Sequence, residues 1–356
     1  MKILYGVQGT GNGHIARARV MAKALARRSE LSVDFVFSGR QPQGYFDMDV
    51  FGQYEALRGL TFSTRKGRVS QWQTLKQANL VQLWRDIRQC DTTSYDVVLN
   101  DFEPITAWAA KRDNTPCISI SHQASFAYPV PKQGDRFVDR LLTRFFAPGD
   151  IQLGVHWYHF GHTIMPPFIE EALDVQPDEK HCLVYLPFEE VPAITALLSS
   201  QPDTAFQCFH PHIRDDHTSG NIHWCKPSKP RFQHAIKHCS GVIANAGFEL
   251  SSEALQLGKK LLLKPLAGQY EQLSNVLTLQ QLDLCTSMQT LDLQTMQHWL
   301  QLPAPEPVTF PSNPDLFIDW LLNEEWEDTE QICKALWAQV NYPHSVKQRL
   351  LKLATS

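Results

Sequence analysis

A run of small residues from 245 to 258 has the chemistry to bind a diphosphate. It leaves an apolar strand at Asn245, turns at Gly247 and enters a helix that Gly258 closes. The first N–H groups of such a helix attract phosphate, and serine hydroxyls add donors, so this site would need no metal. One turn further, Glu253 is placed to accept hydrogen bonds from ribose hydroxyls. The residues predicted to hold diphosphate and ribose are Ala246, Gly247, Phe248, Ser251, Ser252 and Glu253.

A second polar group follows the next predicted strand, residues 259–264. Gln269, Glu271 and Gln272 offer amide and carboxylate groups that suit the hydroxyls of a hexose. Ligands of open α/β sheets bind beyond the carboxyl ends of the strands, where both segments fall. Taken singly, the glycines also fit ordinary helix caps and the glutamates fit solvated helix residues. Because the two motifs are separated by one strand, together they favour a site for a sugar nucleotide.

A glycine-rich loop follows the first predicted strand and opens a helix. The loop lets a ligand approach the backbone closely, and the helix end faces that ligand. It is nearly a dinucleotide fingerprint, but that pattern needs a small residue where His14 stands, and no ribose-binding acid ends the second strand. Arg40, beside that strand, keeps an NADP site open as an alternative. The loop residues are Gly9, Gly11, Asn12 and Gly13.

Two series of strands and helices must position these residues. Short apolar, β-branched runs alternate with helical stretches, which is typical of doubly wound parallel sheets. A proline-rich stretch then precedes a final set of helices. The expected strands are 3–7, 33–37, 97–100 and 117–121 in the first series and 182–186, 205–209, 241–244 and 261–264 in the second; the expected last helices are 316–322, 330–340 and 346–353.

Composition limits the classes of protein that fit. The chain of 356 residues is 43% hydrophobic, enough for two sizeable cores. Its eight cysteines lie far apart and never as CxxC, so we expect buried, reduced thiols in a cytoplasmic protein. No apolar run approaches the length of a membrane span. Residues 1–150 carry 20 Lys and Arg against 14 Asp and Glu, so the first half could meet an anionic acceptor or the inner face of a membrane.

These motifs resemble those of GT-B glycosyltransferases. The Gly247 to Glu253 spacing is similar to the family's diphosphate turn and ribose-binding glutamate, and Glu271-Gln272-x-x-Asn275 resembles its sugar-binding pair followed by a structural asparagine. The chain looks most like the MurG-like branch of families 28 and 1. The resemblance implies two facing Rossmann-like domains with a cleft between them: an acceptor domain at 1–150, a linker at 151–180, a donor domain at 181–312, and helices at 313–356 that pack on the domains.

The same resemblance assigns catalytic roles to the first half. The glycine loop becomes the acceptor-side loop, and His14 becomes the base that removes a proton from an acceptor hydroxyl. Asp101, at the end of a strand on the same sheet edge, would orient His14, with Glu103 as its alternative. A cap for the helix that begins at Pro104 is the other interpretation of Asp101.

The implied activity is transfer of a sugar from a nucleotide donor, expected to be a UDP-sugar, to a hydroxyl, with inversion and without a metal or other cofactor. The acceptor stays open, an anionic or lipid-linked one included, and no nucleic-acid partner is expected. An epimerase or hydrolase of the same fold and a non-catalytic sugar-nucleotide-binding protein remain alternatives. Product analysis with donor alone would identify an epimerase or hydrolase. A His14 variant with no loss of function would indicate a non-catalytic binding protein.

Several weaker patterns carry no assignment. Asp47-x-Asp49 matches a metal-binding pattern of another glycosyltransferase fold, but it lies far from the diphosphate turn in sequence. Two histidine groups lack the accompanying cysteine or acid of a known metal site. Arginines at every fourth residue from 136 to 144 indicate a helix that either packs on its own domain or lies on an anionic membrane. The histidines are His156, His159, His162, His210, His212 and His217.

Overall fold

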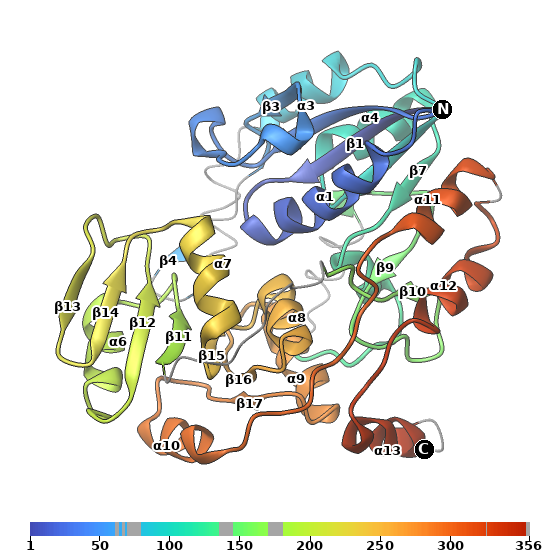
Figure 1. The fold of residues 1–356 in the computed structure, drawn as a ribbon. Helices are drawn as coiled ribbons and strands as arrows, with labels where there is room; N and C mark the ends of the chain where they lie inside the picture. The colour runs from blue at the N-terminus through green and yellow to red at the C-terminus, as the bar shows by residue number, and fades with distance from the viewer. Residues whose placement is uncertain are drawn as a thin grey trace.

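The protein consists of two α/β halves that face each other, as the computed structural model in Figure 1 shows. The structure describes residues 1–60, 64–65, 68–69, 80–134, 145–169, 181–324 and 326–353. The predicted basic helix at 136–144 lies outside these residues. In the described chain, no helix is both long enough and apolar enough to cross a membrane.

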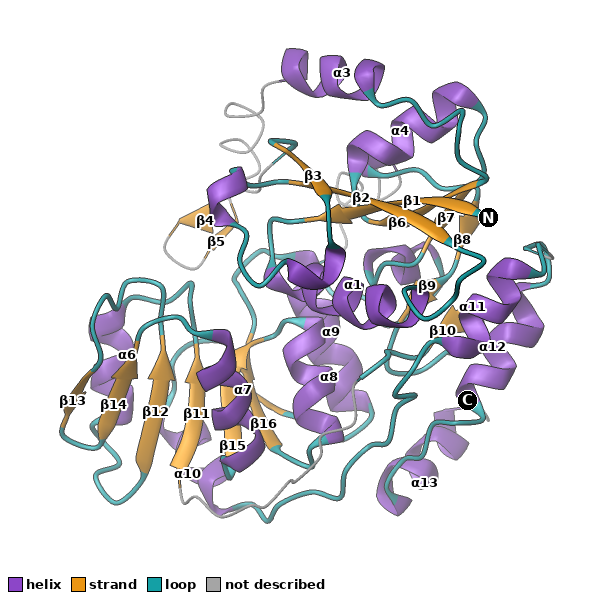
Figure 2. Ribbon diagram, turned by 45° about the horizontal axis from the view of Figure 1, so that its top comes forward, coloured by secondary structure: helices purple, strands orange, loops and turns teal. Residues whose placement is uncertain are grey.

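The first half is built on a six-stranded sheet in which every neighbouring pair is parallel, in the order β3-β2-β1-β6-β7-β8. Figure 2 shows α1 on one face of this sheet and α3 and α4 on the other. The strands are β1 (Lys2–Gln8), β2 (Ser32–Ser38), β3 (Tyr54–Leu57), β6 (Val97–Asp101), β7 (Cys117–Ser119) and β8 (Ile151–Gln152); the helices are α1 (Asn12–Leu25), η1 (Pro42–Gly44), η2 (Asp49–Phe51), α3 (Leu80–Gln89), α4 (Pro104–Asp113) and η3 (Gln123–Ala127).

The second half is built on a seven-stranded sheet, in the order β13-β14-β12-β11-β15-β16-β17. All its neighbouring pairs are parallel except β13 with β14 at one edge. Its strands are β11 (His181–Tyr185), β12 (Ala205–Phe209), β13 (His217–Ser219), β14 (Ile222–Cys225), β15 (Gly241–Asn245), β16 (Lys260–Lys264) and β17 (Thr286–Ser287); its helices are α6 (Val191–Leu198), α7 (Lys229–His238), α8 (Phe248–Gln256), α9 (Tyr270–Gln281) and α10 (Leu293–Gln301).

Short pieces connect and brace the two halves. A small parallel pair, β9 and β10, lies between them in the chain, and an antiparallel pair, β4 and β5, follows β3. The chain then returns from α10 to the first half, where Arg27 and Arg28 at the end of α1 pair with two aspartates of α11. The bounds are β4 (Thr64–Arg65), β5 (Arg68–Val69), β9 (Gly154–Val155), β10 (Ile164–Met165), α11 (Asp315–Leu322), α12 (Thr329–Trp337) and α13 (His344–Leu353).

The fold confirms the expected α/β class with two doubly wound parallel sheets. Each predicted strand is present, because its apolar residues are buried on both faces of a sheet that helices cover. The alternation of apolar runs and helical stretches did not predict β3, β13, β14 and β17, which are short strands at or next to a sheet edge. Residues 151–152, expected in the linker, form the edge strand β8 of the first sheet. Six of the eight cysteines are buried.

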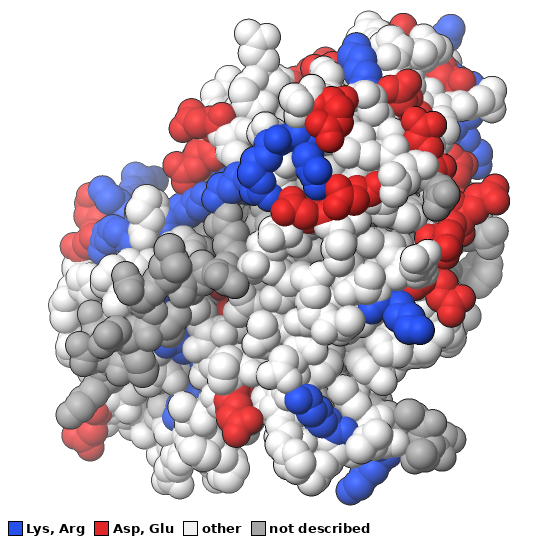
Figure 3. Space-filling view, turned by 45° about the vertical axis from the view of Figure 1, so that its right-hand side comes forward, with Lys and Arg blue, Asp and Glu red and all other residues white. Residues whose placement is uncertain are grey.

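Charged side chains gather over the first half on the face that Figure 3 presents. Lys and Arg lie there next to Asp and Glu, and few charged side chains cover the second half on that face. The ion pairs between α1 and α11 illustrate this pairing: Arg27 lies 2.9 Å from Asp315, and Arg28 lies 2.5 Å from Asp319. The positive excess of the first half is therefore partly paired with acids from the last helices.

Candidate functional site

The starts of α1 and α8 meet between the two sheets (Figures 1 and 2). Each helix follows the carboxyl end of a central strand, α1 after β1 and α8 after β15, so both begin at the ligand-binding edge of a sheet. Gly11 and Gly247, both in extended conformation, are their N-caps. The helices approach so closely that a Cβ on Gly13 would lie 3.0 Å from Glu249 Cγ. This contact explains why a glycine stands before His14.

His14 and Asp101 form a hydrogen-bonded pair at this edge. His14 Nδ1 lies 2.7 Å from Asp101 Oδ1. Because a carboxylate only accepts, Nδ1 carries the proton and Nε2 is left as the basic nitrogen. The Asp101 side chain is fully buried and that of His14 is 14% exposed. The structure thus brings together the two residues that the sequence assigned to the proton transfer.

Arg17 binds the same carboxylate, which the sequence analysis missed. Its Nε donates to Asp101 Oδ2 at 2.8 Å and its Nη2 to Oδ1 at 2.7 Å. Burial favours a raised pKa for Asp101, but the charge of Arg17 and hydrogen bonds from His14 and Arg17 lower that pKa to about 2. An arginine three residues after His14, on the buried side of the helix, was the available signal.

Glu249, from the second half, extends this cluster and was also missed. Arg17 Nη1 donates to Glu249 Oε1, so one guanidinium joins carboxylates from both halves. Burial raises the pKa of Glu249 to about 7, against the lowering effect of Arg17. An acid in the first turn of a helix is a common pattern, so the sequence alone could not single it out.

Glu103 has a different task from Asp101. It is the N-cap of α4, where its carboxylate accepts from the N–H groups of Ile105 at 2.9 Å and Thr106 at 2.6 Å. It also accepts from the hydroxyl of Ser38. The predicted exchange of Glu103 for Asp101 is therefore wrong: Glu103 is enclosed by its own cap, and the cap before Pro104 is Glu103.

Arg40 braces the glycine loop. Its Nε donates to the Gly9 carbonyl, and its Nη1 and Nη2 lie 3.2 and 3.1 Å from Asn12 Oδ1. The Gly9 N–H donates to Ser38 O at 2.5 Å. Because Arg40 is engaged with the loop, its side chain is not set out to meet the extra phosphate of NADP.

The turn before α8 is fixed from the first half. Asn275 Nδ2 donates to Ala246 O at 3.0 Å, and Asn275 Oδ1 lies 2.7 Å from His122 Nε2. The Phe248 ring stacks on His122, with centroids 4.0 Å apart. Asn275 thus has the structural position that the resemblance implied. His122, a buried residue of the other half, was missed because its contact spans 153 residues.

The two serines of α8 are both buried, but they differ in their hydrogen bonds. Ser252 is fully buried, where its hydroxyl donates to Phe248 O and accepts from Trp157 Nε1, both at 2.8 Å. Ser251 is 1% exposed. The Ser252 hydroxyl is engaged with the protein interior, so we withdraw Ser252 as a phosphate donor. The Ser251 hydroxyl is buried and has no hydrogen-bond partner among the described residues, so its predicted role stays a prediction. Glu253, one turn into α8, is half-buried and accepts from Gln233 Nε2 at 3.4 Å.

The residues predicted to hold a hexose differ in their surroundings. Gln269 is the N-cap of α9, where its Oε1 accepts from Gln272 N at 3.2 Å. Gln272 is 7% exposed, and its Oε1 accepts from Leu266 N at 2.9 Å, so it holds the loop before α9. Glu271 reaches the other half and accepts from Gln123 Nε2 at 3.0 Å. Of the three, Glu271 is the one whose side chain hydrogen-bonds to the first half.

The weaker patterns stay without a ligand role. Within the described ranges, no three His, Cys, Asp or Glu side chains lie together as a metal would require. His156 and His210 are fully buried. Asp47 and Asp49 lie in the first half, and the Asp47 carbonyl accepts from Arg19 Nε at 3.2 Å.

Comparison with known proteins identifies the family. The model of glycosyl transferase family 1 matches residues 1–303. No curated sequence matches the chain. Among solved structures, the glycotransferase of kitacinnamycin is similar at 13% identity over 98% of this chain and 97% of that one, with a TM-score of 0.55. SnogD from Streptomyces nogalater is similar at 14% identity over 100% and 99%, with a TM-score of 0.53.

One structure of another activity is also similar. The UDP-GlcNAc 2-epimerase from Neisseria meningitidis shares 13% identity over 91% of this chain and 100% of that one, with a TM-score of 0.51. Such likeness shows the fold alone, which is GT-B, as the sequence motifs predicted. The family match covers both sheets, and it decides between the activities. The chain belongs to glycosyl transferase family 1 and is a glycosyltransferase of the GT-B fold, which uses a nucleotide-sugar donor and an acceptor.

Proposed function

We propose that this glycosyltransferase moves a sugar from a UDP-sugar to an acceptor hydroxyl, with inversion of the anomeric centre and without a metal ion. The observation that carries the proposal is the His14–Asp101 pair, 2.7 Å apart at the start of α1, opposite the start of α8. A base on one half and a phosphate-binding helix end on the other are what a single displacement across a cleft requires.

His14 Nε2 takes the proton of the acceptor hydroxyl in this mechanism. The hydroxyl oxygen forms a bond to the anomeric carbon as the bond from that carbon to the diphosphate breaks. Asp101 accepts the Nδ1 proton of His14 in a hydrogen bond and stabilises the imidazolium that results. One displacement from the side opposite the leaving group inverts the centre.

The leaving diphosphate rests on the start of α8 in this proposal. The first N–H groups of a helix have no partner within it, and Gly247 lets the chain enter α8 in extended conformation. These groups and the helix dipole stabilise the charge that develops on the leaving group, which is why no metal is needed. Ala246 and Phe248 contribute their backbone, since Phe248 uses its ring on His122.

Glu253 and Glu271 are the side chains proposed to bind the rest of the donor. Glu253 lies one turn into α8, beside the proposed diphosphate position, and is half-buried, so it suits the ribose hydroxyls. Glu271 lies at the start of α9 and suits the hydroxyls of the sugar, with Gln269 beside it. Gln272 supports this group by holding the loop before α9.

Two measurements test the proposal. Thermal unfolding in the presence of a panel of UDP- and TDP-sugars should show stabilisation by a UDP-sugar, because a ligand that binds only the folded state raises Tm. His14→Ala should keep that stabilisation and lose sugar transfer. Transfer at the wild-type rate by His14→Ala would remove His14 from the mechanism, and a response to TDP-sugars alone would replace the proposed nucleotide.

The same assays would expose an activity other than sugar transfer. An epimerase or hydrolase would convert the donor without an acceptor, so chromatography of products from donor alone would reveal a new sugar nucleotide or free sugar. A transferase should instead consume donor in step with a glycosylated acceptor. A protein that only binds sugar nucleotides would respond in the thermal assay and give no product.

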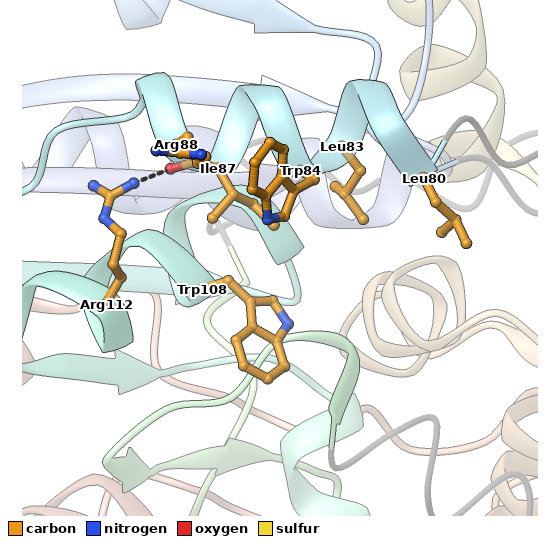
Figure 4. A pocket seen from close by; sticks show the side chains of 7 residues that line it. All are labelled: Leu80, Leu83, Trp84, Ile87, Arg88, Trp108 and Arg112. Carbon is orange, nitrogen blue, oxygen red and sulfur yellow. Dashed lines mark hydrogen bonds between the residues drawn. The ribbon is translucent and has the colours of Figure 1, made fainter.

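We further propose that α3 contacts an anionic membrane surface at the inner face of a cell. Leu80, Val81 and Trp84 are each more than half exposed, and the Arg88 guanidinium lies 4.5 Å from the centre of the Trp84 ring. Figure 4 shows Leu80, Leu83, Trp84 and Ile87 along α3, above Trp108 and Arg112 of α4. Exposed apolar side chains beside arginines are typical of helices that lie on anionic lipid.

Vesicle sedimentation tests this contact. The protein should sediment with vesicles that contain phosphatidylglycerol, and a double change of Leu80 and Trp84 to Ser should abolish this. Leu351→Ser is the matched control, because Leu351 is also strongly exposed but lies on α13. Equal sedimentation of the double variant and the control would rule out α3 as the contact.

A further inference from the structure

Arg17 is a cation shared by carboxylates from both halves of the protein. It contacts both oxygens of Asp101 from the first half and Oε1 of Glu249 from the second, although 232 residues separate Arg17 from Glu249. Its own side chain is 5% exposed. We propose that Arg17 and Glu249 are positioning residues, through which closure of the two halves orients His14 and makes it a stronger base. The inference rests on the proposed role of His14.

The first step of the argument is the hydrogen bonding of Asp101. Its Oδ1 accepts from His14 Nδ1 and from Arg17 Nη2, both at 2.7 Å, and its Oδ2 accepts from Arg17 Nε at 2.8 Å. Two donors from Arg17 fix the plane of the carboxylate, so Oδ1 is held facing His14. Arg17 Nη2 and His14 Nδ1 are 3.2 Å apart because both donate to that oxygen. The guanidinium therefore helps to set the histidine tautomer.

The second step is the balance of charge. Arg17 alone neutralises Asp101, and a neutral pair stabilises an imidazolium at His14 less than a bare carboxylate does. Ionised Glu249 adds one negative charge to the neutral pair of Arg17 and Asp101. Because that charge comes from the second half, the group carries it only where the two halves are in contact. In the proposal, this contact strengthens His14 as a base.

The surroundings of Glu249 support this coupling. The charged and titratable groups that act on it are Arg17, Asp101 and His14 from the first half and Glu253 from its own helix. Tyr5 is also buried, and the charges of Asp101, Arg17 and Glu249 act on its hydroxyl. Burial raises the pKa of Glu249 to about 7, although Arg17 lowers it, so its charge appears in the pH range where an imidazole titrates.

The Gly13 contact is a second, independent observation. A Cβ on Gly13 would lie 3.0 Å from Glu249 Cγ, so the side chain of Glu249 packs directly on the start of the helix that carries His14. Glu249 is also in the first turn of α8, beside the proposed diphosphate position. Glu249 is therefore placed to link two events to His14: contact between the halves and binding of the donor.

The test uses the whole protein without any substrate. Two-dimensional ¹H–¹⁵N NMR of the imidazole rings, with His14→Gln for assignment, reports tautomer and titration of His14. We expect the Nδ1–H tautomer in the wild type. Glu249→Gln should lower the pH at which the His14 signals change, because one nearby negative charge is lost. Arg17→Met should move it up, because it leaves two carboxylates unneutralised.

The opposite directions distinguish coupling from a merely structural role, which would move both variants toward the behaviour of a free histidine. Asp315→Asn is the matched control, because Asp315 also pairs with an arginine, Arg27, which follows the far end of α1 and is exposed. It should leave the His14 signals unchanged. If Arg17→Met does not fold, Glu249→Gln and Glu249→Asp suffice, since Asp restores the charge and should restore most of the shift.

The inference and the proposed function fail in different ways. Wild-type titration and tautomer in Glu249→Gln, or shifts of equal sign in both variants, would overturn the coupling even if His14→Ala abolished transfer. Sugar transfer by His14→Ala at the wild-type rate would instead remove the base role, while the NMR result would still describe the link between the two halves.

Discussion

Replacement of Glu249 by Gln should change how the stability of the protein depends on pH. Burial raises the pKa of Glu249 from 4.5 to about 7 in the folded protein. A carboxyl with a raised folded pKa contributes stability that is fully present below its unfolded pKa, near 4.5, and is lost as pH rises through the folded pKa, near 7. The wild type should therefore lose stability relative to Glu249→Gln as the pH rises.

The magnitude follows from the two pKa values. Each unit of difference corresponds to about 1.4 kcal/mol, so the full effect above pH 8 is roughly 3 kcal/mol. About 1 kcal/mol of that is already present at pH 5, because ionisation in the unfolded chain has begun. Between pH 5 and pH 8 the free energy of unfolding of the wild type should fall by about 2.5 kcal/mol relative to that of the variant.

Urea unfolding of both proteins at pH 5, 6, 7 and 8 measures this difference. Any constant cost of the substitution cancels, since only the change with pH is compared. Asp315→Asn is the control, because Asp315 is 41% exposed and its removal should leave the pH dependence as in the wild type. A wild-type-minus-variant difference that stays constant from pH 5 to pH 8, or that rises, would refute the reasoning about burial of Glu249.

Three further outcomes are expected. Asn275→Ala should cost about 2 to 3 kcal/mol in urea unfolding, because it leaves His122 Nε2 and a buried backbone carbonyl without their partner; a cost below about 0.5 kcal/mol would contradict the bridge. Gly6→Ala should cost more than about 2 kcal/mol, since its Cβ would overlap Thr106 Oγ1, whereas Gly11→Ala, with open space around it, should cost at most about 1 kcal/mol. Sugar transfer should survive dialysis against EDTA, and a loss of about tenfold or more that Mg²⁺ restores would overturn the metal-independent mechanism.

Local patterns in the sequence were enough to predict the frame of the site. Buried strands in a covered parallel sheet are continuous apolar runs, and the turns that follow them carry glycines, so β1 with its loop and β15 with the Gly247 turn were both predictable. His14 and Asp101 could also be paired in advance, because adjacent parallel strands end at one edge: Val7 of β1 lies beside Asp101 of β6.

Only the tertiary structure decided what each polar side chain does. Ser252 lies in the expected helix, but Trp157 packs on that side and donates a hydrogen bond to the Ser252 hydroxyl. Glu103 and Asp101 are two residues apart, yet Phe102, with φ of 56°, turns the chain so that one caps α4 and the other meets α1.

The link between the halves depends on contacts that no local pattern contains. Arg17 and Glu249 each sit on an ordinary helix, and their pairing arises because α1 and α8 are brought end to end across 232 residues of sequence. Sequence periodicity specifies which face of a helix is buried, since that depends on near neighbours. It does not specify which buried charge meets which, because that depends on how the two sheets face each other.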